Sequence, residues 1–325
     1  MTLRLPASNL TAPAQLPVPA APPPGTATDI KGDTVQIPAP FDYARAADVA
    51  DAIALLDRHG PESRLVAGGH SLLPMMKLRL ARPEWLIDIN DLFELDFIVR
   101  EPGRLRVGAL TRHTTLLESP ETGRLYPIIT EAERFIADPV VRNRGTIGGS
   151  LCQADPAEDL STVCTVLRAE VLLRGPGGER TLSMDQFHRG AYETAAAPNE
   201  VLCEILFPIV PGQGSSYEKV ERRVGDWAIT AAGAAVALSA DGSIAAASIG
   251  LTAVGLDGTA AAAEEVLLGA APAPAVINEA ARLAAAACDP VADTRGPVDY
   301  KRHLAEELTR RVLTRACDRA VPQEG

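Results

Sequence analysis

The chain has 325 residues, enough for two or three domains with their own hydrophobic cores. Hydrophobic residues make up 46% of it and aromatic residues only 4%, so the core must consist mainly of Ala, Leu, Val and Ile. A formal net charge of -11 argues against nucleic acid or an anionic membrane as a partner.

The sequence gives no indication of membrane insertion or metal binding. No apolar run reaches the roughly 18–20 residues of a membrane span, and residues 1–40 lack a signal-peptide layout. We therefore expect a cytoplasmic protein, free or held at the inner face of the membrane through partners. Its five cysteines are widely spaced and include no C-x-x-C pair, so zinc and iron–sulfur clusters are not expected on this chain.

The first third of the chain predicts alternating helices and strands after a long extension. Residues 1–38 form a Pro/Ala-rich tract that is expected to be disordered, because it has too little apolar surface to bury. The hydrophobic spacing then predicts helices and strands in alternation, which favours a fold that mixes the two. The expected helices are 48–59 and 72–77, and the expected strands are 64–67, 85–89 and 105–109.

The remainder predicts hairpins followed by helices. Glycine-rich turns at 175–178 and at Asp241-Gly242 separate paired strand candidates and indicate hairpins. The expected strands are 170–173, 179–182, 201–207, 216–220, 231–238 and 243–253. The expected helices are 125–137, 159–167, 275–287 and 298–316.

Two diglycine elements are the most informative local features. Residues 67–71 read AGGHS after a strand, and residues 146–150 read TIGGS after a basic turn. Glycines leave consecutive backbone N–H groups accessible, and such groups can bind phosphate oxygens. Two elements of this kind suit the two phosphates of a dinucleotide. Each alone is more often a tight turn, and neither matches a Rossmann or Walker pattern.

An acidic run follows the second element. Residues 153–159 read QADPAED, and carboxylates beside phosphate are unfavourable unless they face another part of the ligand. Asp159 is a candidate acceptor for a ribityl hydroxyl or a flavin N–H. The alternative is structural: Asp155 caps a helix and Asp159 lies in its first turn.

Several motifs in one order resemble a known family. They are AGGHSLLPMMK at 67–77, TIGGS at 146–150, ADPAED at 154–159, GAYET at 190–194, KVERRVGDW at 219–227 and YKRHL at 300–304. Together they resemble the FAD-binding subunits of the xanthine dehydrogenase, or molybdenum hydroxylase, family. The likeness is greatest to its aerobic carbon monoxide dehydrogenase branch and runs from about residue 41 to 316. The family usually starts near residue 41, and many relatives have Asn where this chain has Ser150.

This resemblance implies an α+β fold. A vanillyl-alcohol-oxidase (PCMH)-type FAD-binding domain would comprise two α/β subdomains, 39–95 and 96–215, followed by a C-terminal antiparallel sheet with helices, 216–325. FAD would lie between the two subdomains, with its diphosphate at the amides of 68–71, Gly148 and Gly149. The implied cofactor-binding residues are Ala67, Gly68, Gly69, His70, Ser71, Thr111, Thr146, Ile147, Gly148, Gly149, Ser150, Asp159, Tyr192 and Lys219.

Lys219 has two interpretations. Beside the flavin it would stabilise the reduced, anionic ring, as charges near a cofactor commonly do. Otherwise it is a solvated surface lysine, the commoner fate of this residue type.

The resemblance also implies a division of labour. No nucleophile triad, metal-ligand set or paired carboxylates predicts substrate chemistry, so no catalytic or metal-binding residue is expected on this chain. In the family, a large subunit carries the molybdopterin cofactor and a small subunit carries [2Fe-2S] clusters, in a dimer of heterotrimers. The chain would take electrons from those clusters into FAD and pass them to an external acceptor such as a quinone.

Other functions stay open at this point. The chain could be a self-contained FAD oxidase or dehydrogenase, or a scaffold with vestigial loops. Within the family, the large subunit sets the substrate, which ranges from carbon monoxide to purines and N-heterocycles.

Overall fold

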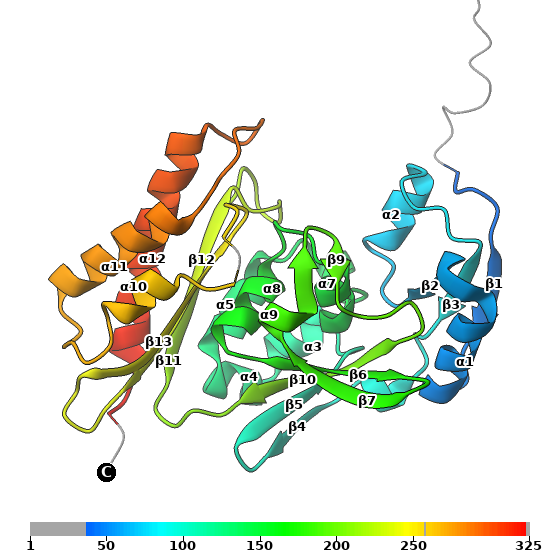
Figure 1. Cartoon of the computed structure of the whole chain (residues 1–325), viewed down its shortest axis with the longest axis horizontal. Coiled ribbons are helices and arrows are strands. Elements are labelled where there is room, and N and C mark those ends of the chain that lie inside the picture. The colour runs from blue at the N-terminus through cyan, green and yellow to red at the C-terminus, as the bar shows by residue number, and fades with distance from the viewer. Residues whose placement is uncertain (1–36, 257, 323–325) are drawn as a thin grey trace, which may run out of the picture. The chain divides into compact units, whose positions relative to one another are not determined.

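The computed structural model describes residues 37–256 and 258–322, so 36 of the 38 residues of the predicted extension lie outside the described residues. Helices and strands are mixed along the chain (Figure 1), which confirms the predicted α+β class. Three larger sheets and one short hairpin organise the described residues.

A small parallel sheet comes first. It contains β1 (Asp42–Arg45), β3 (Trp85–Asp88) and β2 (Ser63–Val66), in that spatial order. Helix α1 (Val49–His59) connects β1 to η1 (Gly60–Glu62) and β2, and α2 (Leu72–Lys77) follows β2. Asp48 caps α1 by accepting a hydrogen bond from the Asp51 amide at 2.7 Å, and Gly60 ends it at φ 72°. These end signals explain why the predicted bounds of α1 were accurate.

The second sheet is antiparallel and has the order β4-β5-β10-β6-β7. Its strands are β4 (Ile98–Glu101), β5 (Arg104–Gly108), β6 (Glu170–Gly175), β7 (Gly178–Ser183) and β10 (Val201–Pro208). The central strand β10 serves two cores. Val201 and Cys203 point into the core of the first sheet. Leu202 and Ile205 point into a larger core between the second sheet and the helices that cover it. The predicted hairpin at 175–178 is confirmed.

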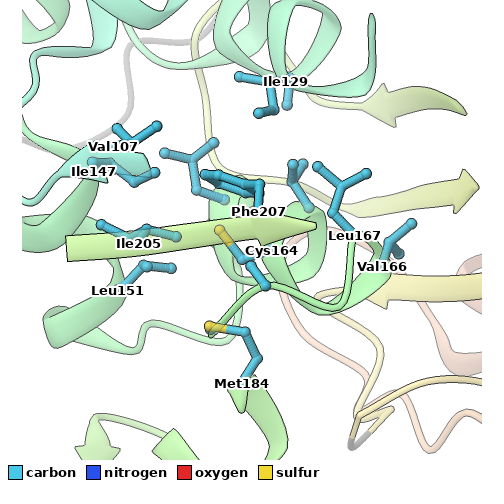
Figure 2. Close-up of a cluster of buried hydrophobic side chains, with 14 of the residues drawn as sticks. Val107, Ile129, Ile147, Leu151, Cys164, Val166, Leu167, Met184, Ile205 and Phe207 are labelled. Atoms are coloured by element: carbon cyan, nitrogen blue, oxygen red, sulfur yellow. The ribbon is translucent and has the colours of Figure 1, made fainter. Parts of the chain in front are cut away.

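Short helices cover this sheet and carry much of the cavity described below. They are η2 (Phe93–Leu95), α3 (His113–Glu118), α4 (Pro120–Leu125), α5 (Pro127–Phe135), α6 (Pro139–Arg142), α7 (Ile147–Gln153), α8 (Asp159–Val166) and α9 (Met184–Phe187). A two-stranded hairpin, β8 (His188–Gly190) with β9 (Glu193–Thr194), follows α9. Figure 2 shows how Ile147 and Leu151 of α7 and Cys164 and Val166 of α8 meet Phe207 in one buried cluster.

One predicted helix boundary was wrong, and so was half of the structural alternative left open for Asp155 and Asp159, although Asp159 does lie in the first turn of α8. The helix predicted over 125–137 starts only at Pro127, because proline has no backbone N–H to continue α4 and instead opens α5. Asp155 does not cap α8. Glu158 does, by accepting hydrogen bonds from the Leu160 and Ser161 amides at 3.0 and 2.6 Å.

The third sheet is antiparallel, with β12 (Thr230–Leu238) between β11 (Gly214–Val220) and β13 (Ile244–Thr252). Helices α10 (Ala261–Glu265), α11 (Pro274–Ala287) and α12 (Val298–Arg319) lie on one side of it, and α5 and α8 lie on the other (Figure 1). Alternate residues of β12 therefore enter different cores, Ala231 and Ala235 one and Ala232 and Ala234 the other. Burial on both faces at close range accounts for the Ala/Gly composition of this strand.

Candidate functional site

One large cavity runs along the region where the first and second sheets meet. Its volume is about 1020 Å³, at the upper end of the range for small-molecule sites. Several parts of the chain contribute to the lining, among them the β2–α2 loop, the residues that follow β5, helices α7 and α8, most of residues 192–202, strand β11, and residues 225–227. The lining includes Ala67 and Ile89, which directly follow the carboxyl ends of parallel strands β2 and β3, where ligands of open α/β sheets usually bind.

The first diglycine element lines this cavity as an open turn. Within the described residues, no protein acceptor meets the backbone N–H groups of Gly68, Gly69, His70 and Ser71. Gly69 adopts φ 77°, a conformation that favours glycine. Four consecutive free amides form a concave set of donors that suits phosphate oxygens.

The second element is a helical turn. Thr146 caps α7 by accepting a hydrogen bond from the Gly149 amide at 3.1 Å, and the Gly148 amide donates to Ala109 O at 2.9 Å. Both amides thus already have an acceptor within the chain, and their contact with a diphosphate stays a prediction. Gly149 and Ser150 still face the cavity, and Gly148 serves close packing: a Cβ there would lie 2.6 Å from Ala109 O.

The first element touches the segment that leads directly into the second. A Cβ at Gly68 would lie 2.3 Å from Arg144 O and 2.8 Å from Gly145 Cα, so only glycine permits this approach. Residues 67–71 and the segment that leads into α7 thus meet although more than 70 positions separate them in the sequence. The predicted convergence of the two elements on one cavity is confirmed.

Another part of the lining carries buried charge. Asp159 accepts hydrogen bonds from Tyr217 Oη at 2.7 Å and from Lys219 Nζ at 2.9 Å. Lys219 also lies 3.5 Å from Glu221 Oε2, and its side chain is 2% exposed, so its interpretation as a solvated surface lysine was wrong. Burial raises the pKa of Asp159 despite the opposing charge of Lys219. A ligand here would meet a fixed, paired cation and anion.

Two further acids lie near this pair. Burial raises the pKa of Glu158 to about 7, against the hydrogen bonds that it accepts from Ser161. Glu133 is fully buried, with both carboxylate oxygens 3.1 Å from His113 Nδ1. Burial lowers the pKa of His113, but Glu133 outweighs this effect and raises it overall. The His113 ring packs on Gly145, so this ion pair supports the contact between the two elements.

Tyr192 lies at the cavity edge in a strained conformation. Its φ is 61°, which is uncommon for an aromatic residue, and its amide donates to Ala154 O at 2.8 Å. Its hydroxyl donates to Asp155 at 3.0 Å, and its side chain is 59% exposed. A large exposed side chain held in strained backbone at a cavity is suited to ligand contact.

Two predicted site residues do not line the cavity. The Thr111 hydroxyl donates to Phe97 O at 3.0 Å and is fully buried, and the Ile147 side chain belongs to the core of Figure 2. Their contribution is backbone pairing, because the Ile147 amide donates to Thr111 O at 3.1 Å. The other twelve predicted residues line the cavity: Ala67, Gly68, Gly69, His70, Ser71, Thr146, Gly148, Gly149, Ser150, Asp159, Tyr192 and Lys219.

Sequence reasoning missed several residues at this site. Tyr217 lies two positions before Lys219, and strand alternation placed both on one face of β11, so this contact was within reach. Asn90 follows the carboxyl end of a parallel strand, another usable indication. The sequence gave no indication of the contact between His113 and Glu133, because their pairing depends on the packing of α3 against α5.

Neither a membrane span nor a metal site is found in the described part of the chain. Within residues 37–256 and 258–322, no helix is long and apolar enough to cross a bilayer. The same residues contain no group of three or more His, Cys, Asp or Glu placed to hold a metal ion.

Comparison with known families identifies the class of this site. Residues 39–210 match the FAD binding domain in molybdopterin dehydrogenase, and residues 215–316 match the CO dehydrogenase flavoprotein C-terminal domain. Most of the cavity lining therefore lies in an FAD-binding domain, and Lys219 and residues 225–227 are contributed by the C-terminal domain. The chain is a flavoprotein subunit of an oxidoreductase.

Known relatives match over nearly their whole length. The carbon monoxide dehydrogenase medium chain of Afipia carboxidovorans is 42% identical over 87% of this chain and 99% of its own, and that of Hydrogenophaga pseudoflava is 41% identical over 86% and 98%. The solved carbon monoxide dehydrogenase of H. pseudoflava, in a form lacking the Mo-pyranopterin moiety, has a chain with TM-score 0.84 and 42% identity, covering 88% of this chain and 100% of that one. The chain belongs to the family of FAD-binding subunits of molybdopterin dehydrogenases.

Proposed function

We propose that the chain is the FAD-carrying, electron-transferring subunit of a carbon monoxide dehydrogenase-type complex. One observation carries this proposal: an open set of four backbone amides and a second diglycine element meet at one cavity of about 1020 Å³ in a chain with medium-chain relatives. Residues 39–95 and 96–215 act as the two FAD subdomains, and residues 216–325 form the C-terminal domain.

The amides of Gly68, Gly69, His70 and Ser71 hold the diphosphate of FAD, with the Ser150 hydroxyl as a further donor. This arrangement differs from the expectation at the sequence level, because α7 contributes a surface and a hydroxyl instead of free amides.

Asp159 and Lys219 contact the ribityl chain and the flavin ring, and Tyr192 packs at the exposed edge. Bound FAD supplies the capacity to accept and release electrons. Lys219 offers a fixed positive charge. It donates to Asp159 at 2.9 Å, and Asp159 is itself held by the Tyr217 hydroxyl, which donates to it at 2.7 Å. The buried position of this triad excludes water, which strengthens its electrostatic effect on the ring.

The proposed partners are a large molybdenum subunit and a small iron–sulfur subunit, assembled as a dimer of heterotrimers. The relatives' name "medium chain" and the molybdenum cofactor named for the solved relative support partner subunits of this kind. Electrons arrive from the iron–sulfur partner and leave to an external acceptor such as a quinone. The complex is cytoplasmic or lies at the inner face of the membrane through its partners.

Co-purification tests this function. The tagged chain, expressed with its neighbouring subunits, should copurify with two further polypeptides, one FAD per chain, iron and molybdenum, and should reduce a dye when carbon monoxide is supplied. Purification as a yellow protein that oxidises a substrate alone would favour a self-contained FAD oxidase. Dye reduction with purines or N-heterocycles but not carbon monoxide would keep the family and replace the substrate.

A further inference from the structure

A chain of polar side chains joins the two diglycine elements behind the cavity. Asn90 Nδ2 donates to Ala67 O at 2.7 Å, at the first residue of the first element. Arg112 Nη2 donates to Asn90 Oδ1 at 3.0 Å, and Arg112 Nη1 donates to Arg144 O. Arg144 O is also the atom against which Gly68 packs. Both ends of this chain of hydrogen bonds therefore lie where the two elements meet.

Each member of this chain is fixed by its own surroundings. The Asn90 backbone and side-chain nitrogens both donate to Asp88 Oδ1 at 2.8 Å, and Asp88 is the last residue of β3. Arg112 forms an antiparallel bridge with Thr146, the residue that caps α7. The orientation of both side chains is thus set by a strand end on one side and by the second element on the other.

Arg112 is used here in an unusual way. Its guanidinium is half-buried, and the two acceptors that it meets at this point are neutral oxygens instead of carboxylates. Burial and the nearby charge of Arg144 lower its pKa. A planar guanidinium suits this task because it can donate in two directions at once, which a lysine ammonium on a flexible stem does less well.

We propose that Asn90 and Arg112 are positioning residues, a relay that holds the two diglycine elements in register as one diphosphate-binding unit. This inference rests on the placement of the diphosphate proposed above. The backbone of the second element is already tied to Arg112's own segment, through the Ile147 and His113 amides. The relay extends that tie to Ala67, so the open turn with four free amides keeps a fixed position relative to α7. Residues that support a binding site in this way reduce the cost of ordering it when ligand arrives.

The test measures FAD affinity and folding stability separately, on the full chain freed of flavin. Fluorescence titration gives the Kd for FAD, and thermal unfolding without FAD gives Tm. Arg112→Ala should raise Kd roughly tenfold or more, the change that corresponds to one lost charge-assisted hydrogen bond, while Tm without FAD stays within a few degrees. The matched control is Arg104→Ala on β5, whose exposed side chain pairs with Glu101 at 2.8 Å outside the cavity lining. It should leave both quantities unchanged.

Asn90→Ala provides a second and independent break in the relay. It should raise Kd in the same direction, and the double variant should bind FAD about as weakly as the worse single variant, because both substitutions interrupt one path. Arg112→Lys keeps the charge but should recover only part of the affinity.

The outcomes separate the relay from the proposed site. A wild-type chain that does not bind FAD overturns both. Wild-type binding with unchanged affinity in Arg112→Ala overturns the relay alone. Equal losses of Tm and affinity in both single variants, or full recovery by Arg112→Lys, also overturn it, since the residues would then act through the fold or through charge.

Discussion

The two diglycine elements have similar sequences and different structures, and the difference shows what a diglycine can do. In the first, four consecutive amides from Gly68 to Ser71 have no protein acceptor among the described residues. In the second, the amides of Gly148 and Gly149 are already bonded within the chain, and Gly148 permits α7 to pack within 2.6 Å of a backbone oxygen. One element therefore offers donors to a ligand, and the other offers close approach. Substitutions at these glycines should separate the two roles.

The largest effect is expected at Gly149, which faces the cavity from the second element. Gly149→Asp places a carboxylate beside the proposed diphosphate, and its Cβ would lie 2.8 Å from the capping Thr146 Oγ1. We expect loss of FAD, measured as the flavin-to-protein absorbance ratio after gel filtration. Gly149→Asn adds similar bulk without charge and should retain part of the flavin. Normal flavin content in Gly149→Asp would show that the diphosphate does not bind beside Gly149.

Gly68→Ala should have the next largest effect, and this effect should fall mainly on FAD binding. The added Cβ would meet Arg144 O at 2.3 Å, so the two elements must separate and the free amides must move. We expect the Kd for FAD to rise by about a hundredfold, a change that corresponds to about 2.7 kcal/mol. Titration of the flavin-free chain with FAD measures it. Gly177→Ala, in the open turn of the β6–β7 hairpin, is the control that should change nothing.

Gly148→Ala should have the opposite effect: it should lower the stability of the fold more than it weakens FAD binding. Its Cβ would lie 2.6 Å from Ala109 O, a backbone atom that cannot rotate away, so the main cost falls on the fold. We expect the free energy of unfolding to decrease by about 3 kcal/mol, as for overpacked cores, and urea unfolding of the flavin-free chain measures it. If Gly148→Ala instead weakened FAD binding with unchanged stability, the distinction drawn between the two elements would be wrong.

The same contrast explains how far the sequence could predict this molecule. Elements with local end signals were predicted closely, such as α1 between Asp48 and Gly60 and the α2 turn at 72–77. The residues at the open element were also predicted, because strand–Gly–Gly is a local pattern. The state of the second element was not, because free and bonded amides look identical in a sequence: the acceptor of the Gly148 N–H is Ala109, 39 positions away.

The supporting residues were out of reach for the same reason. The relay joins Ala67, Asn90, Arg112 and Arg144, which share no spacing or composition and meet only when four parts of the chain have folded. The resemblance implied Asp159 and Lys219 as two separate cofactor contacts and did not indicate that they pair. The structure adds that they bind each other at 2.9 Å, which no single-sequence pattern indicates.

The smallest predicted effect concerns Glu158, the buried cap of α8 that follows the second element. Its pKa in the folded chain is raised to about 7, above the roughly 4.3 of an exposed glutamate. The protonated form is favoured by folding, so its contribution to stability is full below about pH 4.3 and is lost as the pH rises to about 7.

Glu158→Gln cannot ionise and should be more stable than wild type by about 1–2 kcal/mol at pH 8, because the amide gives up charge-assisted hydrogen bonds but avoids a buried charge. At pH 4.5 the difference should vanish. Urea unfolding at both pH values measures it, with exposed Glu118→Gln as the control. An equal stability change at pH 4.5 and pH 8 would mean that burial does not raise the pKa of Glu158 in the folded chain.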